Sequence, residues 1–456
     1  MKITISNRIE LTGAPAFFVK LLQNRLTIEN PKWLENEKMD RWNGNTTRYL
    51  DFYEFHLDGG VPTMTLPRGF IRQLINLCYR HDVTFELEDH RRRLTEVDFS
   101  FHGDLKPFQQ EAAGEMLSKD FGTLSAATGS GKTVITLYLI AERKQPALII
   151  VHTKELLNQW VDRIETFLGI PESEIGIIGA GKKRIGDRIT VALVQTLYKV
   201  VEDIAPYSGY LVVDECHRTP SRTFTEAVKA FDAYYMTGLS ATPWRRDRLS
   251  KLIFWHIGEV VHEVDKTELV ENGHILKAEI ITRETDFKPY FDPVNQYSKM
   301  LSELTQDEDR NLLIAGDIAK ESRNSGGVCL VLSDRKDHCK TIQTILSERF
   351  RISSDVLTGA ISTNQRKDVV TRLNDGKIRI LIATGQLIGE GFDASELSTL
   401  FFVTPVKFSG RVIQYLGRVL RPAPEKTRAK VFDYVDIKVP VLVAAAKARQ
   451  RVYGGE

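Results

Sequence analysis

Two series of short apolar, β-rich runs alternate with helical segments along this chain. This alternation limits the folds that the chain can adopt more than any other feature of its sequence. Apolar runs of this kind indicate strands that are buried on both faces, and their alternation with helices indicates parallel strands joined by crossovers. The sequence therefore predicts an α/β protein with two doubly wound parallel sheets. The expected strands are Thr123–Ala126, Ala147–Val151, Ile189–Val194, Tyr210–Val213 and Tyr235–Gly238 in the first series, and Val328–Leu332, Ser354–Leu357, Ile378–Ala383, Thr399–Val403 and Lys430–Tyr434 in the second.

The segments outside the two series suggest a small additional domain and a linker. Residues 1–100 mix weakly alternating runs such as Lys2–Leu11 with helical spacing over Ala14–Leu26, which predicts a small α+β domain. Residues 283–310 are polar and contain two prolines, so we expect the linker between the two α/β domains there. The predicted domains are 1–100, an accessory α+β domain, then 101–282 and 283–456, one doubly wound sheet each.

Composition excludes some classes of protein and leaves others open. The chain has 62 basic and 60 acidic residues, so its net charge of +2 does not by itself indicate a nucleic-acid partner. None of its four cysteines forms a Cys-x-x-Cys pair, which argues against a zinc site. The N-terminus lacks the apolar core of a signal peptide, and no long apolar run is present. We therefore expect a cytoplasmic protein without a membrane partner.

A glycine-containing loop lies between the first apolar run and a helical segment, and reads Ala-Ala-Thr-Gly-Ser-Gly-Lys-Thr from Ala126 to Thr133. Glycines let backbone amides point inward at a phosphate, and the N-terminus of the following helix favours an anion. Lys132 would reach the β- and γ-phosphates of ATP, and the Thr133 hydroxyl would bind Mg²⁺. The strict pattern has glycine where Ala126 stands. The predicted phosphate-binding residues are Thr128, Gly129, Ser130, Gly131, Lys132 and Thr133.

Two carboxylates follow the apolar run that ends at Val213. Asp214 and Glu215 would therefore stand at the carboxyl edge of the sheet, where doubly wound folds bind their ligands. We expect Asp214 to hold Mg²⁺, and Glu215 to orient and deprotonate the water that attacks the γ-phosphate. Together with the loop, the pair predicts ATP and Mg²⁺ as cofactors and ATP hydrolysis as the reaction.

Further motifs, in their order along the chain, resemble those of superfamily 2 helicases and so imply two RecA-like domains. Lys106–Gln109 resembles the adenine-recognition motif of that family, with Gln109 on the base. Ala383–Asp393 resembles motif V and Gln414–Arg421 resembles motif VI. Guanidinium groups can stabilise the charge that develops on a γ-phosphoryl group. The resemblance implies that Gly389 and Asp393 contact the nucleotide, that Gln414, Arg418 and Arg421 are catalytic, and that His217, Ser240 and Thr242 couple ATP state to domain movement.

The segment Ser240–Pro243 resembles motif III of the superfamily. Within the superfamily, the resemblance is to XPB-like and phage UvsW-like DNA helicases, through Gly417–Arg421 and the layout after motif III. XPB proteins have Arg-Glu-Asp where this chain has Arg245-Arg246-Asp247, with a base in the middle. Two interpretations of this triplet therefore stay open, a role in melting DNA and a basic loop near the strand. The resemblance implies 3′-to-5′ polarity, a monomer, and a role in branch migration, recombination or repair in a phage or bacterium.

Candidate contacts to nucleic acid are hydroxyl side chains in motifs that resemble strand-binding segments. Backbone contacts are blind to sequence, as a translocating motor requires. Each hydroxyl could instead serve as a helix cap or turn residue. The candidates are Thr153, Thr196, Ser333 and Thr384.

The N-terminal domain interleaves four aromatic residues with basic ones. Such residues can stack on bases, although aromatic side chains in a small domain are more often core, so a core role is favoured. The run Arg91-Arg92-Arg93 is expected to be a solvated linker or a duplex contact. The aromatic residues are Trp33, Trp42, Tyr49 and Tyr53, near Lys32, Lys38, Arg41 and Arg48.

Three functions are consistent with these motifs. The first is an ATP-dependent DNA helicase or translocase acting on single-stranded, forked or junction DNA. The second is an RNA helicase, because contacts to the backbone serve both nucleic acids. The third is a DNA-binding remodeller or targeting subunit whose ATPase only gates its attachment.

Overall fold

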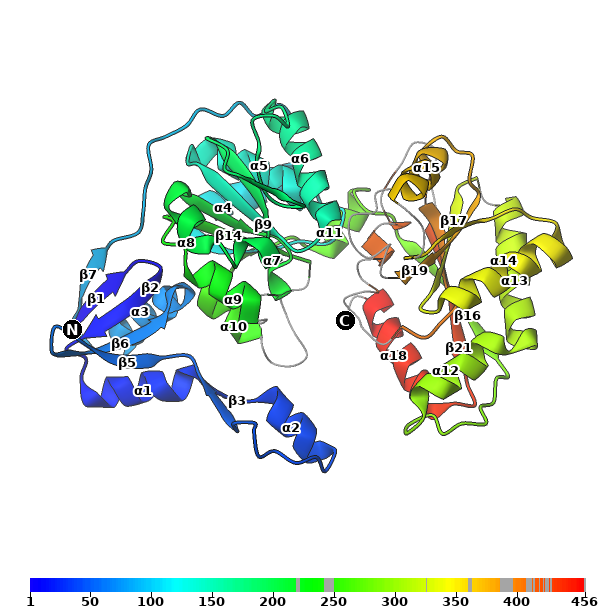
Figure 1. The fold of residues 1–456 in the computed structure, drawn as a ribbon, viewed down its shortest axis with the longest axis horizontal. Coiled ribbons are helices and arrows are strands. Elements are labelled where there is room, and N and C mark those ends of the chain that lie inside the picture. The colour runs from blue at the N-terminus through cyan, green and yellow to red at the C-terminus, as the bar shows by residue number, and fades with distance from the viewer. Residues whose placement is uncertain are drawn as a thin grey trace. The chain divides into compact units, whose positions relative to one another are not determined.

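The computed structural model describes the chain (Figure 1) except for residues 219–221, 242–249, 325, 360–362, 386–396, 407–411, 413–414, 418, 421, 423–425, 427–428 and 455–456. It contains a small N-terminal module and two α/β sheets, as the sequence predicts. Among the described residues, no helix is both long enough and apolar enough to cross a membrane.

The N-terminal module is built on a five-stranded mixed sheet in the order β5-β6-β2-β1-β7. The run expected as one strand over Lys2–Leu11 is instead a hairpin, because the chain turns at Ser6 and Asn7, where Ser6 N donates to Arg8 O. The elements are β1 (Lys2–Ile5), β2 (Arg8–Thr12), α1 (Ala16–Leu26), β3 (Thr27–Glu29), α2 (Pro31–Lys38), β4 (Tyr49–Asp51), β5 (Glu54–Asp58), β6 (Val61–Pro67), the 3₁₀ turn η1 (Arg68–Phe70), α3 (Ile71–Arg80) and β7 (Glu86–Asp89).

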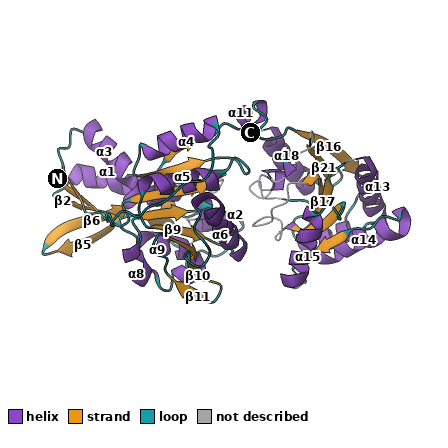
Figure 2. Cartoon of the chain, turned by 90° about the horizontal axis from the view of Figure 1, so that it is seen from above, coloured by secondary structure: helices purple, strands orange, loops and turns teal. Residues whose placement is uncertain are grey.

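The first α/β sheet has eight strands in the order β11-β10-β12-β9-β13-β14-β8-β15, parallel except for the β10–β11 pair. Helices lie on both sides of this sheet (Figure 2). Each strand predicted in this series is present, and β10, β11 and β15 are additional. The elements are α4 (Pro107–Leu117), β8 (Phe121–Ser125), α5 (Lys132–Arg143), β9 (Ala147–Val151), α6 (Lys154–Leu168), β10 (Gly176–Gly179), β11 (Lys182–Arg184), β12 (Ile189–Leu193), α7 (Val194–Leu197), α8 (Val201–Ile204), η2 (Ala205–Tyr207), β13 (Tyr210–Val213), η3 (Cys216–Arg218), α9 (Arg222–Lys229), β14 (Tyr235–Ser240), α10 (Ser250–Ile257) and β15 (Val260–Glu263).

The second α/β sheet has six parallel strands in the order β16-β21-β20-β17-β19-β18. Each strand predicted in the second series is present, and β16 is additional. The elements are α11 (Lys266–Glu271), β16 (Ala278–Thr285), α12 (Tyr297–Gln306), α13 (Glu308–Asn324), β17 (Val328–Ser333), α14 (Lys336–Phe350), β18 (Asp355–Leu357), α15 (Thr363–Asn374), β19 (Ile380–Thr384), β20 (Leu397–Phe402), β21 (Ala429–Asp436) and α18 (Pro440–Gly454).

The segment 283–310, expected as a linker, contains the end of β16, all of α12 and the start of α13. Met300 and Leu304 of α12 are buried and pack in a small core with Phe287 and Leu442. The polar residues that suggested a linker cover the solvent side of α12, and Asp307 accepts a hydrogen bond from Arg310 N at the start of α13. The predicted domain boundaries at 100 and 282 stay predictions.

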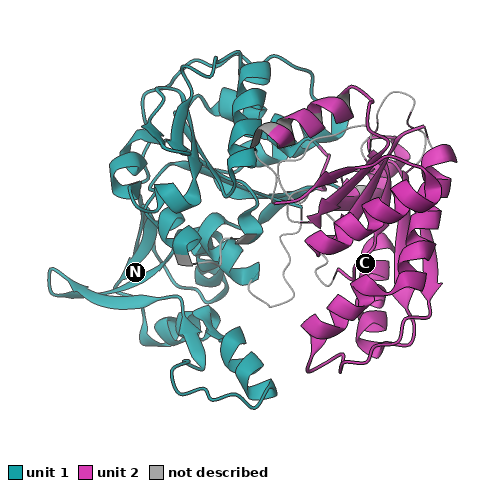
Figure 3. Ribbon diagram, turned by 45° about the vertical axis from the view of Figure 1, so that its right-hand side comes forward, with its two compact units in different colours: residues 1–126, 131–264 teal, residues 127–130, 265–456 magenta. Residues whose placement is uncertain are grey.

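The described residues group into two compact units (Figure 3). One unit comprises residues 1–126 and 131–264, and the other comprises residues 127–130 and 265–456. The N-terminal module and the first α/β sheet thus form one unit, with a continuous hydrophobic core. This core includes Ile3, Phe18 and Phe70 from the module, and Val213 and Trp255 from the α/β domain.

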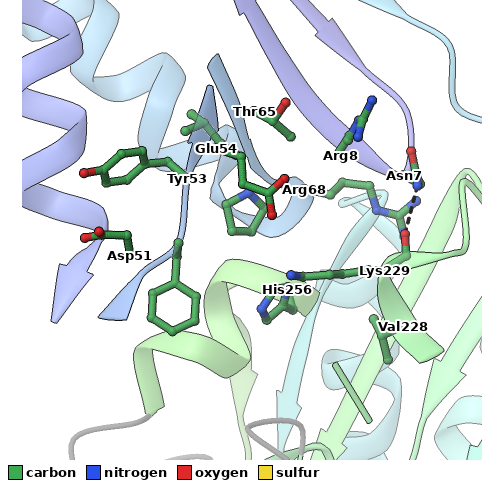
Figure 4. Close-up of a pocket in the computed structure, with 13 residues that line it drawn as sticks. Asn7, Arg8, Asp51, Tyr53, Glu54, Thr65, Arg68, Val228, Lys229 and His256 are labelled. Atoms are coloured by element: carbon green, nitrogen blue, oxygen red, sulfur yellow. Dashed lines mark hydrogen bonds between the residues drawn. The ribbon is translucent and has the colours of Figure 1, made fainter. Parts of the chain in front are cut away.

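Polar contacts hold the N-terminal module against the α/β domain as well. Asn7 Nδ2 donates to Lys229 O at 3.0 Å beside a small hollow at this junction (Figure 4). The buried Arg68 donates to Ala233 O at 2.9 Å. Gly69 allows η1 to approach α10, because a Cβ at this position would lie 2.5 Å from Phe254 O. The module is therefore docked by polar side chains and by a close approach of its backbone, as well as by apolar side chains.

The arginine run 91–93 is not a solvated linker. Arg91 is 8% exposed and forms ion pairs with Asp89 and Asp120, at 2.6 and 2.9 Å. The guanidinium groups of Arg91 and Arg93 lie 4.1 and 3.7 Å from the centre of the Tyr234 ring. The run is thus a docked connection between the module and the α/β domain, in which the Arg91 side chain is withdrawn from solvent while Arg93 stays exposed.

Residues 27–51, which we call the arm, contrast with the rest of the module. They comprise β3, α2 and β4, and Figure 1 shows α2 apart from the five-stranded sheet. None of these residues is buried. Trp42 is 80% exposed and Tyr49 is 51% exposed, while Trp33 is half-buried. The expectation that the aromatic residues form a core is therefore wrong for the arm.

Candidate functional site

The glycine loop adopts the backbone that the sequence predicts between β8 and α5. Gly129 and Gly131 have φ angles of 94° and 82°, which only glycine adopts at little cost. Ser130 Oγ donates to Ala127 O at 2.8 Å, which closes the turn. Lys132 begins α5, and its Nζ donates to Ala126 O at 2.7 Å, so the ammonium group folds back toward the start of the loop.

Gln109 lies beside this loop, as expected for a residue that contacts a bound base. It is buried, and its Oε1 accepts a hydrogen bond from Lys106 N at 3.0 Å, which closes the N-terminus of α4. A Cβ on Gly131 would lie 2.4 Å from Gln109 Nε2. Gly131 is therefore required twice, for its positive φ and for the close approach of this amide.

Asp214 follows β13 and is held by two donors. Its Oδ2 accepts from Trp160 Nε1 and its Oδ1 accepts from Glu215 N, both at 2.9 Å. Burial raises the pKa of Asp214, and the neighbouring charge of Glu215 raises it further, while the Trp160 bond and Lys132 act in the opposite direction. Asp214 therefore lies where a cation would offset an unfavourable charge.

Glu215 lies close to His217, a predicted coupling residue. Its Oε2 is 3.0 Å from His217 Nδ1, and this nitrogen is 3.2 Å from Ser240 Oγ at the end of β14. Burial alone would raise the pKa of Glu215, but His217 and Lys132 favour the ionised form and lower the pKa to about 2. Glu215 has a φ of 50°, a left-handed conformation that few non-glycine residues adopt. The structure thus brings Glu215, His217 and Ser240 together.

The carboxyl ends of the first sheet bring further predicted residues to one edge. Ser125 pairs with Ser240, Val213 with both Gly238 and Ile150, and Val151 with Leu193, so β8, β14, β13, β9 and β12 end within two residues of one another. Thr153 follows β9 and caps α6, where its Oγ1 accepts from Leu156 N at 3.2 Å. Thr196 lies in α7, directly after β12. The candidate strand contacts of this domain therefore share an edge with Asp214.

The two candidate strand contacts of the second sheet differ in exposure. Ser333 is buried at the end of β17, and its hydroxyl donates to Arg335 O and bonds His338 Nδ1 at 3.0 Å. This geometry favours the turn role that the sequence left open for Ser333. Thr384 ends β19 and is half-buried.

Several predicted residues lie outside the described part of the chain. They are Thr242, the triplet Arg245-Arg246-Asp247, Gly389, Asp393, Gln414, Arg418 and Arg421. Their roles stay predictions.

The sequence did not single out Trp160 for a role at the site. Its indole reaches Asp214 from α6, 54 residues away in the chain. A buried tryptophan on a helix is ordinarily a core residue, and periodicity carries no sign of its hydrogen-bonding partner. Only the folded structure, which brings α6 to the Asp214 side chain after β13, reveals the contact.

The residues present fit a nucleotide with a divalent cation. The loop backbone bends at two glycines, and Lys132 begins the following helix. The buried carboxylate of Asp214 follows β13 of the same sheet. Oxygen ligands such as the Asp214 carboxylate and the Thr133 hydroxyl are those that Mg²⁺ prefers. Among the described residues, no cluster of three or more His, Cys, Asp or Glu side chains could hold a metal ion.

Comparison with known families identifies both α/β regions. Residues 102–245 match the family described as type III restriction enzyme, res subunit. Residues 302–423 match the family described as helicase conserved C-terminal domain. The two matches contain the phosphate loop and the motif VI segment respectively, in the order that the sequence predicts.

Individual relatives agree with this assignment. The DNA 3′-5′ translocase XPB2 of Sulfurisphaera tokodaii is 26% identical over 351 residues, which cover 70% of this chain and 79% of the relative. A protein of Acanthamoeba polyphaga mimivirus, provisionally named ATP-dependent RNA helicase L396, is 25% identical over 78% of this chain and 69% of its own length. The structure of S. cerevisiae Dbp5 bound to RNA and ADP BeF3 shares the fold at 14% identity, with a TM-score of 0.55 over 77% of this chain and 88% of that one.

The fold, the loop and carboxylate geometry, and the order of the two family matches agree with one another. RecA-like parallel sheets carry both matched regions, and the predicted ATP-hydrolysing activity belongs to this class. The chain carries a type III restriction res-subunit domain and a helicase C-terminal domain, and it is similar to superfamily 2 helicases of the XPB type.

Proposed function

We propose that this chain is an ATP-driven DNA motor that unwinds or branch-migrates forked or junction DNA, working 3′ to 5′ as a monomer in replication, recombination or repair. The observation that carries this proposal is the shared sheet edge. Lys132 and Asp214 of the ATP site and the candidate strand contacts Thr153 and Thr196 all follow parallel strands that end within two residues of one another at this edge. A shift in the position of the ATP-site residues can therefore be transmitted through the rigid sheet to the candidate strand contacts.

We assign ATP and Mg²⁺ to the residues of this edge. Gln109 would bind the base, the loop and Lys132 would bind the phosphates, and Thr133 and Asp214 would hold Mg²⁺. Bound Mg²⁺–ATP supplies the phosphoanhydride bond whose hydrolysis drives movement. The pKa of Glu215 is about 2, so its carboxylate is ionised at neutral pH. In this form Glu215 would orient the water that attacks the γ-phosphate.

The second domain would complete the catalytic set. We assign to Arg418 and Arg421 the stabilisation of charge on the γ-phosphoryl group, with Gln414 as their partner and with Gly389 and Asp393 at the nucleotide. His217, Ser240 and Thr242 would transmit the state of the γ-phosphate. The contact of His217 with both Glu215 and Ser240 supports this relay.

The arm is our candidate for substrate selection. Arg48 lies 4.8 Å from the centre of the Trp33 ring and 5.4 Å from that of Tyr49, while Trp42 is free to stack. Exposed aromatic side chains stack on unpaired bases, which branched DNA offers. The four basic residues of the arm are offset by five acidic ones, so stacking should contribute more than phosphate attraction: Lys32, Lys38, Arg41 and Arg48 against Glu29, Glu35, Glu37, Asp40 and Asp51.

A substrate panel tests the proposal. ATPase rate and strand separation would be measured in parallel on forks, four-way junctions, tailed duplexes and single-stranded RNA. The proposal predicts ATP-dependent strand separation, with junctions and forks preferred over tailed duplexes. Equal stimulation by RNA and by branched DNA would contradict the DNA assignment.

An RNA helicase is the second candidate, and the mimivirus relative provisionally named as an RNA helicase favours it. Candidate contacts through Thr153, Thr196 and Thr384 would serve the backbone of either nucleic acid. Unwinding of an RNA duplex at a rate equal to that of a DNA fork would select this candidate.

A third candidate is an ATP-gated DNA-binding remodeller or targeting subunit, which the restriction-subunit family match favours. Such a protein would bind and release DNA with ATP but would not displace a strand. ATP-dependent release without any strand displacement on the whole panel would select it.

A further inference from the structure

We infer that Trp160 is a positioning residue, whose indole N–H holds the Asp214 carboxylate in the orientation that Mg²⁺ requires. The inference rests on the proposed role of Asp214. Trp160 Nε1 lies 2.9 Å from Asp214 Oδ2, and both side chains are buried, at 2% and 8% exposure. A charged acceptor makes this a strong hydrogen bond.

The Asp214 carboxylate is fixed from two sides. Its Oδ2 accepts from Trp160 on α6, and its Oδ1 accepts from the backbone of Glu215 after β13. These are its two donors among the described residues. Each carboxylate oxygen has two lone pairs, so one lone pair on each stays available to a cation or to a water bound to it. Donors on separate elements prevent rotation of the carboxylate about its bond to the chain.

The indole is itself held rigidly. Trp160 lies on the buried face of α6 with Leu157, Val161 and Ile164. Phenylalanine would fill most of this space and would lose only the N–H donor and part of the ring. Removal of the donor would leave Asp214 Oδ2 buried without its partner, which costs more than the bond itself contributes.

The test compares nucleotide affinity with and without Mg²⁺ in three variants. Binding of a fluorescent ATP analogue would be titrated with excess Mg²⁺ and again with EDTA, and the ratio of the two affinities would be calculated. Asp214→Asn serves as the reference for loss of the cation ligand. Trp255→Phe is the matched control, because Trp255 is also buried but packs against Phe52.

We expect Trp160→Phe to lower the Mg²⁺-dependent gain in affinity about tenfold, with the affinity in EDTA unchanged. Trp255→Phe should change neither value. In a double-mutant cycle, Trp160→Phe should add little to Asp214→Asn, since both act through one carboxylate. An unchanged Mg²⁺-dependent gain, or an equal loss with and without Mg²⁺, would overturn the inference.

Two further results keep the test decisive. If Trp160→Phe fails to fold, benzothienylalanine at position 160 keeps the double ring and replaces the N–H by sulfur, and the same ratio applies. If Asp214→Asn itself leaves the Mg²⁺-dependent gain intact, the proposed role of Asp214 fails. If Asp214→Asn lowers the gain and Trp160→Phe does not, only the inference about Trp160 fails.

Discussion

The phosphate site and the arm hold their functional side chains in opposite ways. The buried Asp214 and the partly buried Glu215 are held by Trp160, His217 and the backbone, whereas none of residues 27–51 is buried and Trp42 is 80% exposed. Chemistry on a phosphate requires groups that do not reorganise, and capture of a variable branch requires groups that are accessible. Substitutions at the phosphate site should therefore affect ATP hydrolysis, whereas substitutions in the arm should affect the binding of nucleic acid.

The body of the N-terminal module lies between these extremes. It shares one hydrophobic core with the first α/β domain and is tied to it by Arg68 and Arg91. The arm therefore projects from a base that is rigidly joined to the motor. Under the proposed function, movement of the motor would be transmitted through this base to DNA held by the arm.

The largest effect is expected at the phosphate site. Glu215→Gln keeps the volume but removes the charge that orients water, so turnover should fall about 10²- to 10⁴-fold. ATP binding should be retained. Steady-state ATPase assays and nucleotide titrations would measure both values, with Glu202→Gln on the surface of α8 as the control. Turnover within a few-fold of the wild type would remove Glu215 from the catalytic set.

The rigid base of the arm is tested by Gly69→Ala. The new Cβ would meet the backbone of α10 at 2.5 Å, so we expect a loss of about 1–3 kcal/mol in the free energy of unfolding. Gly114→Ala is the control, because a Cβ there meets nothing within 4 Å and alanine favours a helix by about 1 kcal/mol. Thermal unfolding of both variants would measure the difference. Equal melting temperatures would show that close docking of η1 does not stabilise the module.

Acid should weaken the same junction through His256. Burial, with the nearby Lys229, lowers the pKa of His256 from 6.5 to about 3, so the folded protein keeps this ring neutral while the unfolded chain binds a proton. Stability is therefore lost as the pH falls from 6.5 toward 3, by about 1.4 kcal/mol per pH unit. His256→Gln should flatten the dependence of the melting temperature on pH, and the exposed His81→Gln should not. A parallel slope in both variants would contradict this assignment.

The smallest effect is expected at the arm. Trp42→Ala removes one stacking surface, so the Kd for forked DNA should rise about tenfold. The ATPase rate at saturating DNA and the melting temperature should stay at wild-type values. Fluorescence anisotropy would measure the Kd, with Tyr79→Ala, an exposed aromatic on α3, as the control. A loss of ATPase activity in Trp42→Ala at saturating DNA would contradict the view that the arm and the phosphate site serve different steps.

Local pattern in the sequence was enough to predict the ten strands of the two series and the bend of the glycine loop. Each depends on residues that are close together in the chain, such as an apolar run followed by Gly129 and Gly131. Segment 283–310 was misjudged because the polar face of α12 resembles a linker when its buried Met300 and Leu304 are not yet placed. Composition alone could not separate an exposed arm from a core.

Contacts between distant parts of the chain escaped prediction. The bond from Trp160 to Asp214 spans 54 residues, and the stacking of Arg93 on Tyr234 depends on how the module docks. The pKa values of Asp214 and Glu215 move in opposite directions although the two residues are adjacent, because burial and the charge of Glu215 raise that of Asp214, whereas His217 lowers that of Glu215. Such differences depend on the tertiary structure, and the spacing of residues along the sequence does not reveal them.

One measurement tests the central claim that ATP hydrolysis drives movement on DNA. Strand displacement on a forked duplex would be followed for the wild-type protein and for Lys132→Ala, with DNA affinity measured on the same samples. The account predicts that Lys132→Ala binds the fork as tightly as the wild type but loses both ATPase and strand displacement. Strand displacement that continues in Lys132→Ala without ATPase would contradict it.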